Sequence, residues 1–283
     1  MKIAITSSKD NFTEEQQKQL AEVGEVVYID PPTEYDFEYY KKRVAGAEVL
    51  AADPDNLGGF EKVRENLTEL METLPDLRGL TFNATSFGWI DLNYCKKRGI
   101  TACNVPGYSK ESVAELTLTL LLGLSLKVFL ADRRTQKGNF VLEGGYELKG
   151  KSLGVIGLGS IGSRTAELGC AIGMRVIAYN RSSKSQDGVV MKSFDEVLKN
   201  SDYIAIHVTH TDENKNLITK EQLSKMKDGV MIVNTADREA INEEDLTVAL
   251  KSGQVGGYAY EGEDFERTPL AAVENAFGFR PIA

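Results

Sequence analysis

Short apolar runs alternate with amphipathic stretches over the first hundred residues. The apolar runs have the length of buried strands, and the stretches between them repeat apolar positions at helical spacing. The predicted strands cover residues 2–6, 25–29, 47–52 and 77–85. The predicted helices cover residues 13–23, 36–45, 60–73 and 91–98. This alternation predicts a parallel sheet with helices on both faces.

A second alternating series begins at residue 152. Its predicted strands cover residues 152–156, 175–180, 203–208, 230–235 and 255–261. Its predicted helices cover residues 160–172, 193–199, 220–226 and 243–251. Between the two series, "NVPGYS" (104–109) combines Pro and Gly, a composition typical of a hinge. We therefore predict an α/β protein with two doubly wound parallel-sheet domains, residues 1–103 and 104–283.

The most apolar stretch of the chain, "VAELTLTLLLGLSLKVFLA" (113–131), lies just after the predicted hinge. Glu115 and Lys127 interrupt it, so too few uncharged residues remain to cross a hydrocarbon core. We predict one buried helix there instead of a membrane span. The helical region 112–130 is also expected to form the seam of a homodimer.

Composition and charge disfavour some classes of binding partner. Apolar residues make up 42% of the 283 residues and charged residues 27%, as in ordinary soluble proteins. A formal net charge of −9 repels phosphate backbones and anionic lipid surfaces, so neither nucleic acid nor a membrane is expected as the main partner. The odd, widely spaced set of Cys95, Cys103 and Cys170 predicts a reducing, cytoplasmic compartment, with no disulfide framework and no metal site.

A glycine-rich motif supplies the first chemical signal. "GVIGLGSIG" places Gly157, Gly159 and Gly162 in G-x-G-x-x-G spacing, directly after a predicted strand and at the start of a predicted helix. Such glycines allow a tight turn and a close approach of a pyrophosphate to the backbone, and the N–H groups near Ser160 and Ile161 attract that anion. The motif predicts a Rossmann NAD(P)-binding domain. This context disfavours the alternative, a glycine-rich turn without a ligand.

The end of the next strand indicates which nucleotide is bound. NAD-binding domains usually carry a carboxylate there for the ribose 2′-hydroxyl, whereas this chain has Asn180, followed by Arg181 and Ser182. Without the carboxylate, and with a guanidinium that can fork onto phosphate oxygens, the pocket should accept a 2′-phosphate. We predict NADP(H) as the preferred cofactor, with NAD(H) possible. The alternative is a solvated loop.

Four segments together resemble the D-isomer-specific 2-hydroxyacid dehydrogenases. They are "ITACNVPGYSKESVAEL", "YELKGKSLGVIGLGSIG", "HVTHTDENKNLI" and "VNTADREAINEEDL", and the likeness runs from about residue 75 to 283. The resemblance implies a flavodoxin-like substrate domain (1–103) and a Rossmann domain (104–283), usually in a dimer. It also implies hydride transfer from a nicotinamide cofactor to the C2 carbonyl of a small 2-oxo acid.

The sequence departs from the family's pattern at the acid–base site. The family's substrate-gripping Arg falls on Asp237, with Arg238 one step later, and the family's acid His falls on Pro281. The family's Glu lands near Glu263 or Asp264. Two unit charges about 4 Å apart interact by roughly 4 kcal/mol at an effective dielectric near 20, so Asp237 would repel an ordinary 2-oxo acid. Three alternatives remain: Arg238 replaces the missing Arg, the substrate is neutral or cationic, or redox chemistry has been lost.

Further candidate residues have a functional and a plain interpretation. His210 and Tyr260 are candidate proton donors, against a surface loop for the first and core packing for the second. The resemblance implies that His207 lines the cofactor, and three other residues at strand ends are further candidates for binding it: Thr209, Thr235 and Ala236. Backbone N–H groups of Ala84, Thr85 and Ser86 are candidates for binding a substrate oxyanion or carboxylate, against a simple strand-to-helix turn.

The sequence therefore predicts an NAD(P)-dependent oxidoreductase acting on a small carbonyl or hydroxy compound, with an altered acid–base site. The alternative class is a catalytically inactive NAD(P)-binding protein that regulates or senses. The printed sequence stops at Ala283, where the resemblance implies a further segment that returns to the first domain. A less restrained pair of domains, a partner subunit that supplies the segment, and a shortened sequence all remain open.

Overall fold

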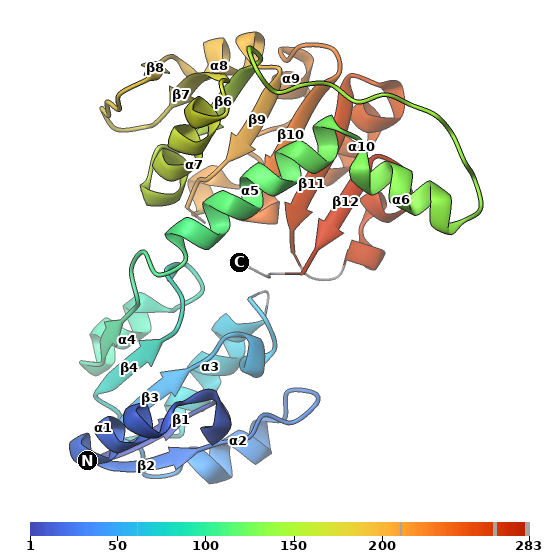
Figure 1. The fold of residues 1–283 in the computed structure, drawn as a ribbon. Coiled ribbons are helices and arrows are strands. Elements are labelled where there is room, and N and C mark those ends of the chain that lie inside the picture. The colour runs from blue at the N-terminus through green and yellow to red at the C-terminus, as the bar shows by residue number, and fades with distance from the viewer. Residues whose placement is uncertain (61, 210, 263–264, 281–283) are drawn as a thin grey trace. The chain divides into compact units, whose positions relative to one another are not determined.

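The chain folds into two compact units, Met1–Tyr108 and the part that begins at Ser109 (Figure 1). The structure is a computed structural model that describes residues 1–60, 62–209, 211–262 and 265–280. Each unit has its own parallel sheet and its own buried core. The predicted fold class is confirmed.

The first unit contains a five-stranded parallel sheet. Its strands are β1 (Lys2–Ile5), β2 (Glu25–Tyr28), β3 (Val49–Ala52), β4 (Gly79–Phe82) and β5 (Thr101–Cys103). The order β2-β1-β3-β4-β5 is the flavodoxin-like order, with its switch point between β1 and β3. Ile3 lies opposite Val26 on one side and Val49 on the other. Strand β5 was not predicted from the sequence.

The helices of this unit are α1 (Glu14–Val23), α2 (Phe37–Val44), α3 (Val63–Glu72) and α4 (Leu92–Arg98). Helices α1, α2 and α4 begin at capping residues, whereas the residue before α3, Lys62, makes no capping hydrogen bond with its side chain. Thr13 and Gln16 form a capping box at α1, and the carboxylates of Asp36 and Asp91 accept N–H groups at the starts of α2 and α4. These side chains satisfy N–H groups that have no partner inside the helix. The four helices predicted for this unit are confirmed.

The second unit contains a seven-stranded parallel sheet. Its strands are β6 (Ser152–Ile156), β7 (Arg175–Tyr179), β8 (Val189–Met191), β9 (Tyr203–Ile206), β10 (Val230–Asn234), β11 (Val255–Glu261) and β12 (Ala276–Phe279). The order is β12-β11-β10-β9-β6-β7-β8. Chain order reverses between β6 and β9, which is the switch point of a Rossmann fold and the usual place for a dinucleotide. The short strands β8 and β12 were not predicted.

The sheet of the second unit is covered by buried clusters on both faces. The helices are α5 (Lys110–Ser125), α6 (Val128–Gln136), α7 (Ser160–Ala171), α8 (Phe194–Asn200), α9 (Lys220–Ser224) and α10 (Glu243–Ser252). Side chains of β6 and β10 alternate between two apolar clusters, with Ile156 and Ile232 in one and Val155 and Val233 in the other. Buried strands of this kind read as nearly continuous apolar runs, which is why the sequence predicted them.

The prediction of one helix over 112–130 is wrong, because α5 ends at Ser125 and α6 begins at Val128 after a bend of 64°. Lys127 occupies the left-handed region at φ 57°. The ring of Phe129 folds back onto Gly123, where a β-carbon would come within 2.1 Å of it. No single helix in the described ranges is long and apolar enough to cross a membrane. The bent pair of α5 and α6 together has the length and the composition of a membrane span.

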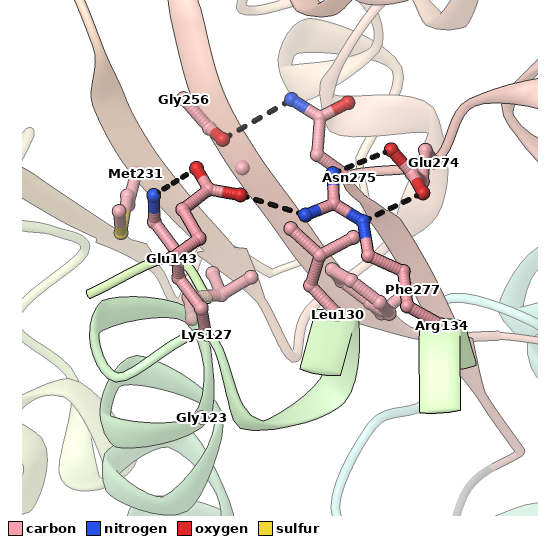
Figure 2. A pocket seen from close by; sticks show the side chains of 12 residues that line it. Gly123, Lys127, Leu130, Arg134, Glu143, Met231, Gly256, Glu274, Asn275 and Phe277 are labelled. Carbon is pink, nitrogen blue, oxygen red and sulfur yellow. Dashed lines mark hydrogen bonds and ion pairs between the residues drawn. The ribbon is translucent and has the colours of Figure 1, made fainter. Parts of the chain in front are cut away.

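A cavity of about 250 Å³ lies beside this bend (Figure 2). Met231, Gly256 and Phe277 line it, each from the second residue of its strand, β10, β11 and β12. The cavity therefore lies at the edge of the sheet opposite to the carboxyl ends of the strands. Its polar wall is an ion-pair network in which Glu143 contacts Lys127 and Arg134, and Arg134 forks onto Glu274 at 2.8 and 2.9 Å. The network fastens α6 and the segment after it to the sheet.

Candidate functional site

The predicted cofactor residues gather at the carboxyl edge of the seven-stranded sheet. They follow four neighbouring strands: Gly157, Gly159, Ser160, Ile161 and Gly162 after β6; Asn180, Arg181 and Ser182 after β7; His207 and Thr209 after β9; Thr235 and Ala236 after β10. Parallel strands present all their carboxyl ends at one edge, so residues far apart in the chain meet there. Their assignment to a cofactor remains a prediction.

The three glycines have three different environments. Gly157 has φ +95°, and a β-carbon on it would approach the carbonyl oxygen of His207 to 2.5 Å. A β-carbon on Gly162 would lie 1.9 Å from the carbonyl oxygen of Gly157. At Gly159 a β-carbon would meet nothing within 4 Å. The first and third glycines are therefore required by the protein itself, whereas the second borders open space that a ligand can use.

The open space beside Gly159 faces the start of α7, a helix of 12 residues. Gly159 is the N-cap of α7 and has no side chain with which to satisfy the first N–H groups. The first turn contains no acidic residue, so the positive end of the helix is not neutralised there. A pyrophosphate would complement both the open side of Gly159 and this charge, so the residues present suit a dinucleotide.

Asn180 holds the loop after β7 against the glycine loop. Its Oδ1 accepts the N–H of Leu158 at 2.9 Å, and its Nδ2 donates to both the carbonyl oxygen and the hydroxyl of Ser182, at 3.0 and 2.9 Å. The side chain of Arg181 is exposed and pairs with Glu213 in the loop after β9. Position 180 therefore organises the loop, and the charge next to the expected ribose is that of Arg181.

His207 ends a chain of hydrogen bonds that begins on α5. The hydroxyl of Thr117 donates to the carbonyl oxygen of Val113 at 2.8 Å and lies 3.1 Å from the hydroxyl of Thr235, which lies 3.3 Å from Nδ1 of His207. The hydroxyl proton of Thr117 is already used in the hydrogen bond to Val113. The hydroxyl of Thr235 therefore donates to the oxygen of Thr117 and accepts a hydrogen bond from Nδ1–H of His207. Nε2 of His207 is then an acceptor, and it is buried without a hydrogen-bond partner in the described ranges.

Burial also fixes the charge of His207. It lowers the pKa of the imidazole from its usual 6.5 to about 4, so the ring is neutral at pH 7. A neutral imidazole with a proton on Nδ1 can accept a hydrogen bond at Nε2 but cannot donate a proton there. His207 is thus suited to position a ligand that carries an N–H or O–H group.

Asp237 and Arg238 follow β10 in a single helical turn, η4 (Arg238–Ala240). The carboxylate of Asp237 caps that turn by accepting the N–H of Glu239 at 2.7 Å. The guanidinium of Arg238 forks onto Glu243, at 2.7 and 3.4 Å. The Arg that the sequence offered as a replacement is therefore engaged by a carboxylate of α10, and the acidic side chain has a capping role as well as its charge.

Tyr260 lies inside the core of the second unit. Its ring stacks on that of Tyr258 with the centroids 5.2 Å apart and also packs against Phe265. Both tyrosines are fully buried, and burial raises the pKa of each hydroxyl above its usual range. These surroundings favour the packing interpretation of Tyr260. Its proposed role as a proton donor stays a prediction.

In the first unit, the turn after β4 holds Ala84, Thr85 and Ser86. The carbonyl oxygen of Ala84 accepts a hydrogen bond from the N–H of Val105 at 3.3 Å, and that of Thr85 accepts from Nδ2 of Asn104 at 2.7 Å. The carbonyl oxygen of Ser86 accepts from Nε1 of Trp89 at 3.0 Å. In a trans peptide the N–H points opposite to the carbonyl, so the N–H groups of Thr85 and Ser86 point away from these donors. That geometry suits an anion-binding turn. Trp89 is buried in the core, packed on Phe82.

His210, Glu263, Asp264 and Pro281 lie outside the described residues. Two acidic residues at the carboxyl edge of the sheet were not predicted from the sequence: Glu261, which ends β11, and Glu213, the partner of Arg181. An acidic residue at the end of a strand was a usable signal for Glu261. No group of three or more His, Cys, Asp or Glu residues within the described ranges is arranged to hold a metal ion.

The fold and the glycine loop define a Rossmann-type nucleotide-binding protein with a flavodoxin-like first unit. Residues 118–278 match the family model described as "D-isomer specific 2-hydroxyacid dehydrogenase, NAD binding domain". The chain therefore belongs to the D-isomer-specific 2-hydroxyacid dehydrogenase family, and the predicted family is confirmed.

Two curated relatives show the range of the likeness. The chain is 36% identical to an aromatic 2-oxoacid reductase of Clostridium sporogenes over 227 residues, which are 78% of this chain and 66% of that protein. It is 33% identical to a 2-hydroxyacid dehydrogenase homolog of Haemophilus influenzae over 276 residues, or 94% of this chain and 80% of the relative. The match to the first relative thus spans just under two thirds of its length.

Solved structures of the same fold carry ligands. An acyclic imino acid reductase in complex with NADPH and D-Arg matches with a TM-score of 0.84 and 26% identity, over 99% of this chain and 89% of the other. A D-lactate dehydrogenase from Aquifex aeolicus, complexed with NAD and lactic acid, matches with a TM-score of 0.79 and 28% identity, over 98% and 87%. These neighbours agree with the predicted use of a nicotinamide cofactor.

Proposed function

We propose that this protein is a nicotinamide-dependent oxidoreductase that transfers hydride between NADP(H) and a small carbonyl or hydroxy compound. The observation that carries the proposal is the glycine loop: two glycines are required by close backbone contacts, and the third opens onto the unneutralised start of α7. A loop built only for structure would not need the open side at Gly159. Membership of a family of named reductases and dehydrogenases supports the same chemistry.

Different residues of the chain would bind different parts of the cofactor. The N–H groups of Ser160 and Ile161 would hold the pyrophosphate, and Asn180 would keep the ribose-facing loop in place. The neutral His207 would accept a hydrogen bond at Nε2 from an N–H or O–H group of the cofactor or substrate. When bound, the cofactor supplies or accepts the hydride.

We propose NADP(H) as the preferred nucleotide and NAD(H) as the weaker one. The strand-end carboxylate that would repel a 2′-phosphate is replaced by Asn180, and the adjacent Arg181 is an exposed guanidinium on the same loop. The acyclic imino acid reductase that matches this fold was solved with NADPH. An exposed Arg can fork onto phosphate oxygens at little cost of burial.

For the substrate, we propose a neutral or cationic compound instead of a simple 2-oxo acid. The Arg expected at position 237 is Asp, and Arg238 is engaged by Glu243, so the described part of this loop presents an acidic group where the family presents a cation. The neighbour solved with D-Arg, a cationic ligand, is compatible with this direction. A substrate that carries an amine or imine nitrogen would meet Asp237 favourably.

We propose a homodimer that uses the bend between α5 and α6 and the segment after it. This region exposes several large apolar side chains: Leu126, Val128, Phe140, Val141, Leu142 and Tyr146. Phe140 and Leu142 are 84% and 92% exposed, which is unusual for neighbouring apolar residues and typical of an interface. Light scattering should give the mass of a dimer for the wild-type protein and of a monomer for Phe140→Ser with Leu142→Ser. A wild-type monomer would contradict this part of the proposal.

The test of the activity is the absorbance of reduced nicotinamide during incubation with NADPH and a panel of carbonyl compounds. The panel includes 2-oxo acids, aldehydes, and 2-oxo acids mixed with ammonium or simple amines. We expect oxidation of NADPH with at least one member, fastest where the compound is neutral or carries a nitrogen. Nucleotide binding without turnover of any member would favour the alternative, an inactive nucleotide-binding protein.

A further inference from the structure

The ion pair between Arg181 and Glu213 joins the two loops that flank the glycine loop. Arg181 follows β7, Glu213 lies in η3 (Asp212–Asn214) after β9, and β6 lies between these two strands in the sheet. Because the strands are parallel, all three loops leave the same edge. The pair therefore joins the two sides of the glycine loop, which follows β6 from Gly157 onward.

Each of the two loops is held by its own hydrogen bonds. Asn180 ties the β7 loop to Leu158 and Ser182, and on the other side Nδ2 of Asn214 donates to the carbonyl oxygen of Thr209 at 2.7 Å. Arg181 and Glu213 are 77% and 75% exposed. Both side chains can therefore separate without disturbing the backbone that presents them, at the small free-energy cost of a solvent-exposed pair.

The carboxylate of Glu213 is paired with the guanidinium of Arg181, the group that a 2′-phosphate would bind. A guanidinium binds carboxylate and phosphate with the same forked geometry, so one anion excludes the other from those N–H groups. We propose that Glu213 is a specificity-determining residue that competes with the 2′-phosphate of NADP(H) for Arg181. The inference rests on the proposed nucleotide site, and it makes the preference for NADP(H) weaker than Arg181 alone would give.

NAD(H) has no phosphate at this position, so its binding leaves the pair closed. NADP(H) must open the pair, and removal of the carboxylate should therefore help NADP(H) alone. Exposed ion pairs contribute about 0.2–1 kcal/mol, which corresponds to roughly 1.4- to 5-fold in affinity. The expected effect is accordingly small, specific for one nucleotide, and dependent on Arg181.

The experiment is calorimetric titration of the full chain with NADPH and NADH. We expect Glu213→Gln to bind NADPH about 1.4- to 5-fold more tightly than wild type, with NADH unchanged. Glu221→Gln is the matched control, because Glu221 of α9 is similarly exposed and pairs at 2.9 Å with Lys225, the residue that follows the helix. In an Arg181→Gln background, Glu213→Gln should have no further effect on NADPH.

Equal gains for NADPH and NADH, or a gain that persists without Arg181, would overturn the proposed competition. An unchanged NADPH affinity in Glu213→Gln would overturn it as well. Failure of wild-type protein to bind either nucleotide would instead overturn the proposed function itself.

Discussion

The carbonyl oxygen of His207 lies against the α-carbon of Gly157, so closely that a β-carbon at residue 157 would come within 2.5 Å of it. The contact joins the ends of β6 and β9, the two strands between which chain order reverses. Gly157 also has φ +95°, a conformation that other residues adopt only with strain. The glycine is therefore part of the fold, whether or not a ligand is present.

Replacing Gly157 should consequently damage stability as well as binding. In Gly157→Ala the methyl group must displace the backbone of His207 in addition to bearing the strain of a positive φ, and we expect a loss of about 2 kcal/mol or more in the free energy of unfolding. Urea unfolding monitored by circular dichroism gives this value. A variant as stable as wild type would show that the loop is looser than described.

The charge at position 237 should determine which substrates bind. Asp237→Asn keeps the cap on the N–H of Glu239 but removes the charge, and Asp237→Arg restores the family's cation. We expect the KM for 2-oxo acids to fall in the order wild type, Asn, Arg, by about tenfold or more overall, or ~1.4 kcal/mol. Nitrogen-bearing substrates should show the opposite order. The same KM for anionic substrates in all three proteins would contradict the electrostatic explanation.

Protonation of His207 should destabilise the fold in mild acid. Its pKa is lowered by burial to about 4, against an ordinary value of 6.5, so the unfolded chain binds this proton first as the pH falls. The stabilisation is fully present above pH 6.5, is lost between about pH 6.5 and 4, and amounts to something on the order of 3 kcal/mol.

The measurement is urea unfolding of wild type and His207→Gln from pH 7 to pH 4. The difference between the two proteins should shrink as the pH falls, because only the wild type has this histidine to protonate, while His210 is present in both. A difference that stays constant over this range would show that His207 titrates alike in the folded and unfolded chains.

The sequence predicted the elements whose signal is local or periodic. The buried strands β6, β9 and β10 are continuous apolar runs, and the glycine spacing after β6 needs no tertiary information. The strands β5 and β8 are three residues long, which is too short for a periodic pattern to be recognised. Strand recognition therefore failed where pairing with a neighbouring strand, and not the pattern of the strand itself, decides the structure.

The misses at the bend and at the site have tertiary causes. The break at Lys127 depends on Phe129 packing onto Gly123, a contact that periodicity cannot show because the apolar pattern continues through it. The engagement of Arg238 by Glu243 and of Arg181 by Glu213 joins residues whose charges were visible but whose pairing was not. The sequence identified the charged groups, and the fold decided which of them are already paired.

The most direct test of the nucleotide site is calorimetric titration of Gly159→Ala with NADPH. Gly159 has an ordinary φ of −76°, and a β-carbon there would touch no protein atom within 4 Å, so the variant should unfold within about 1 kcal/mol of wild type. The methyl group would instead occupy the space assigned to the pyrophosphate, and we expect NADPH affinity to fall at least about tenfold. Wild-type affinity in a normally folded Gly159→Ala protein would contradict the placement of the cofactor on this loop.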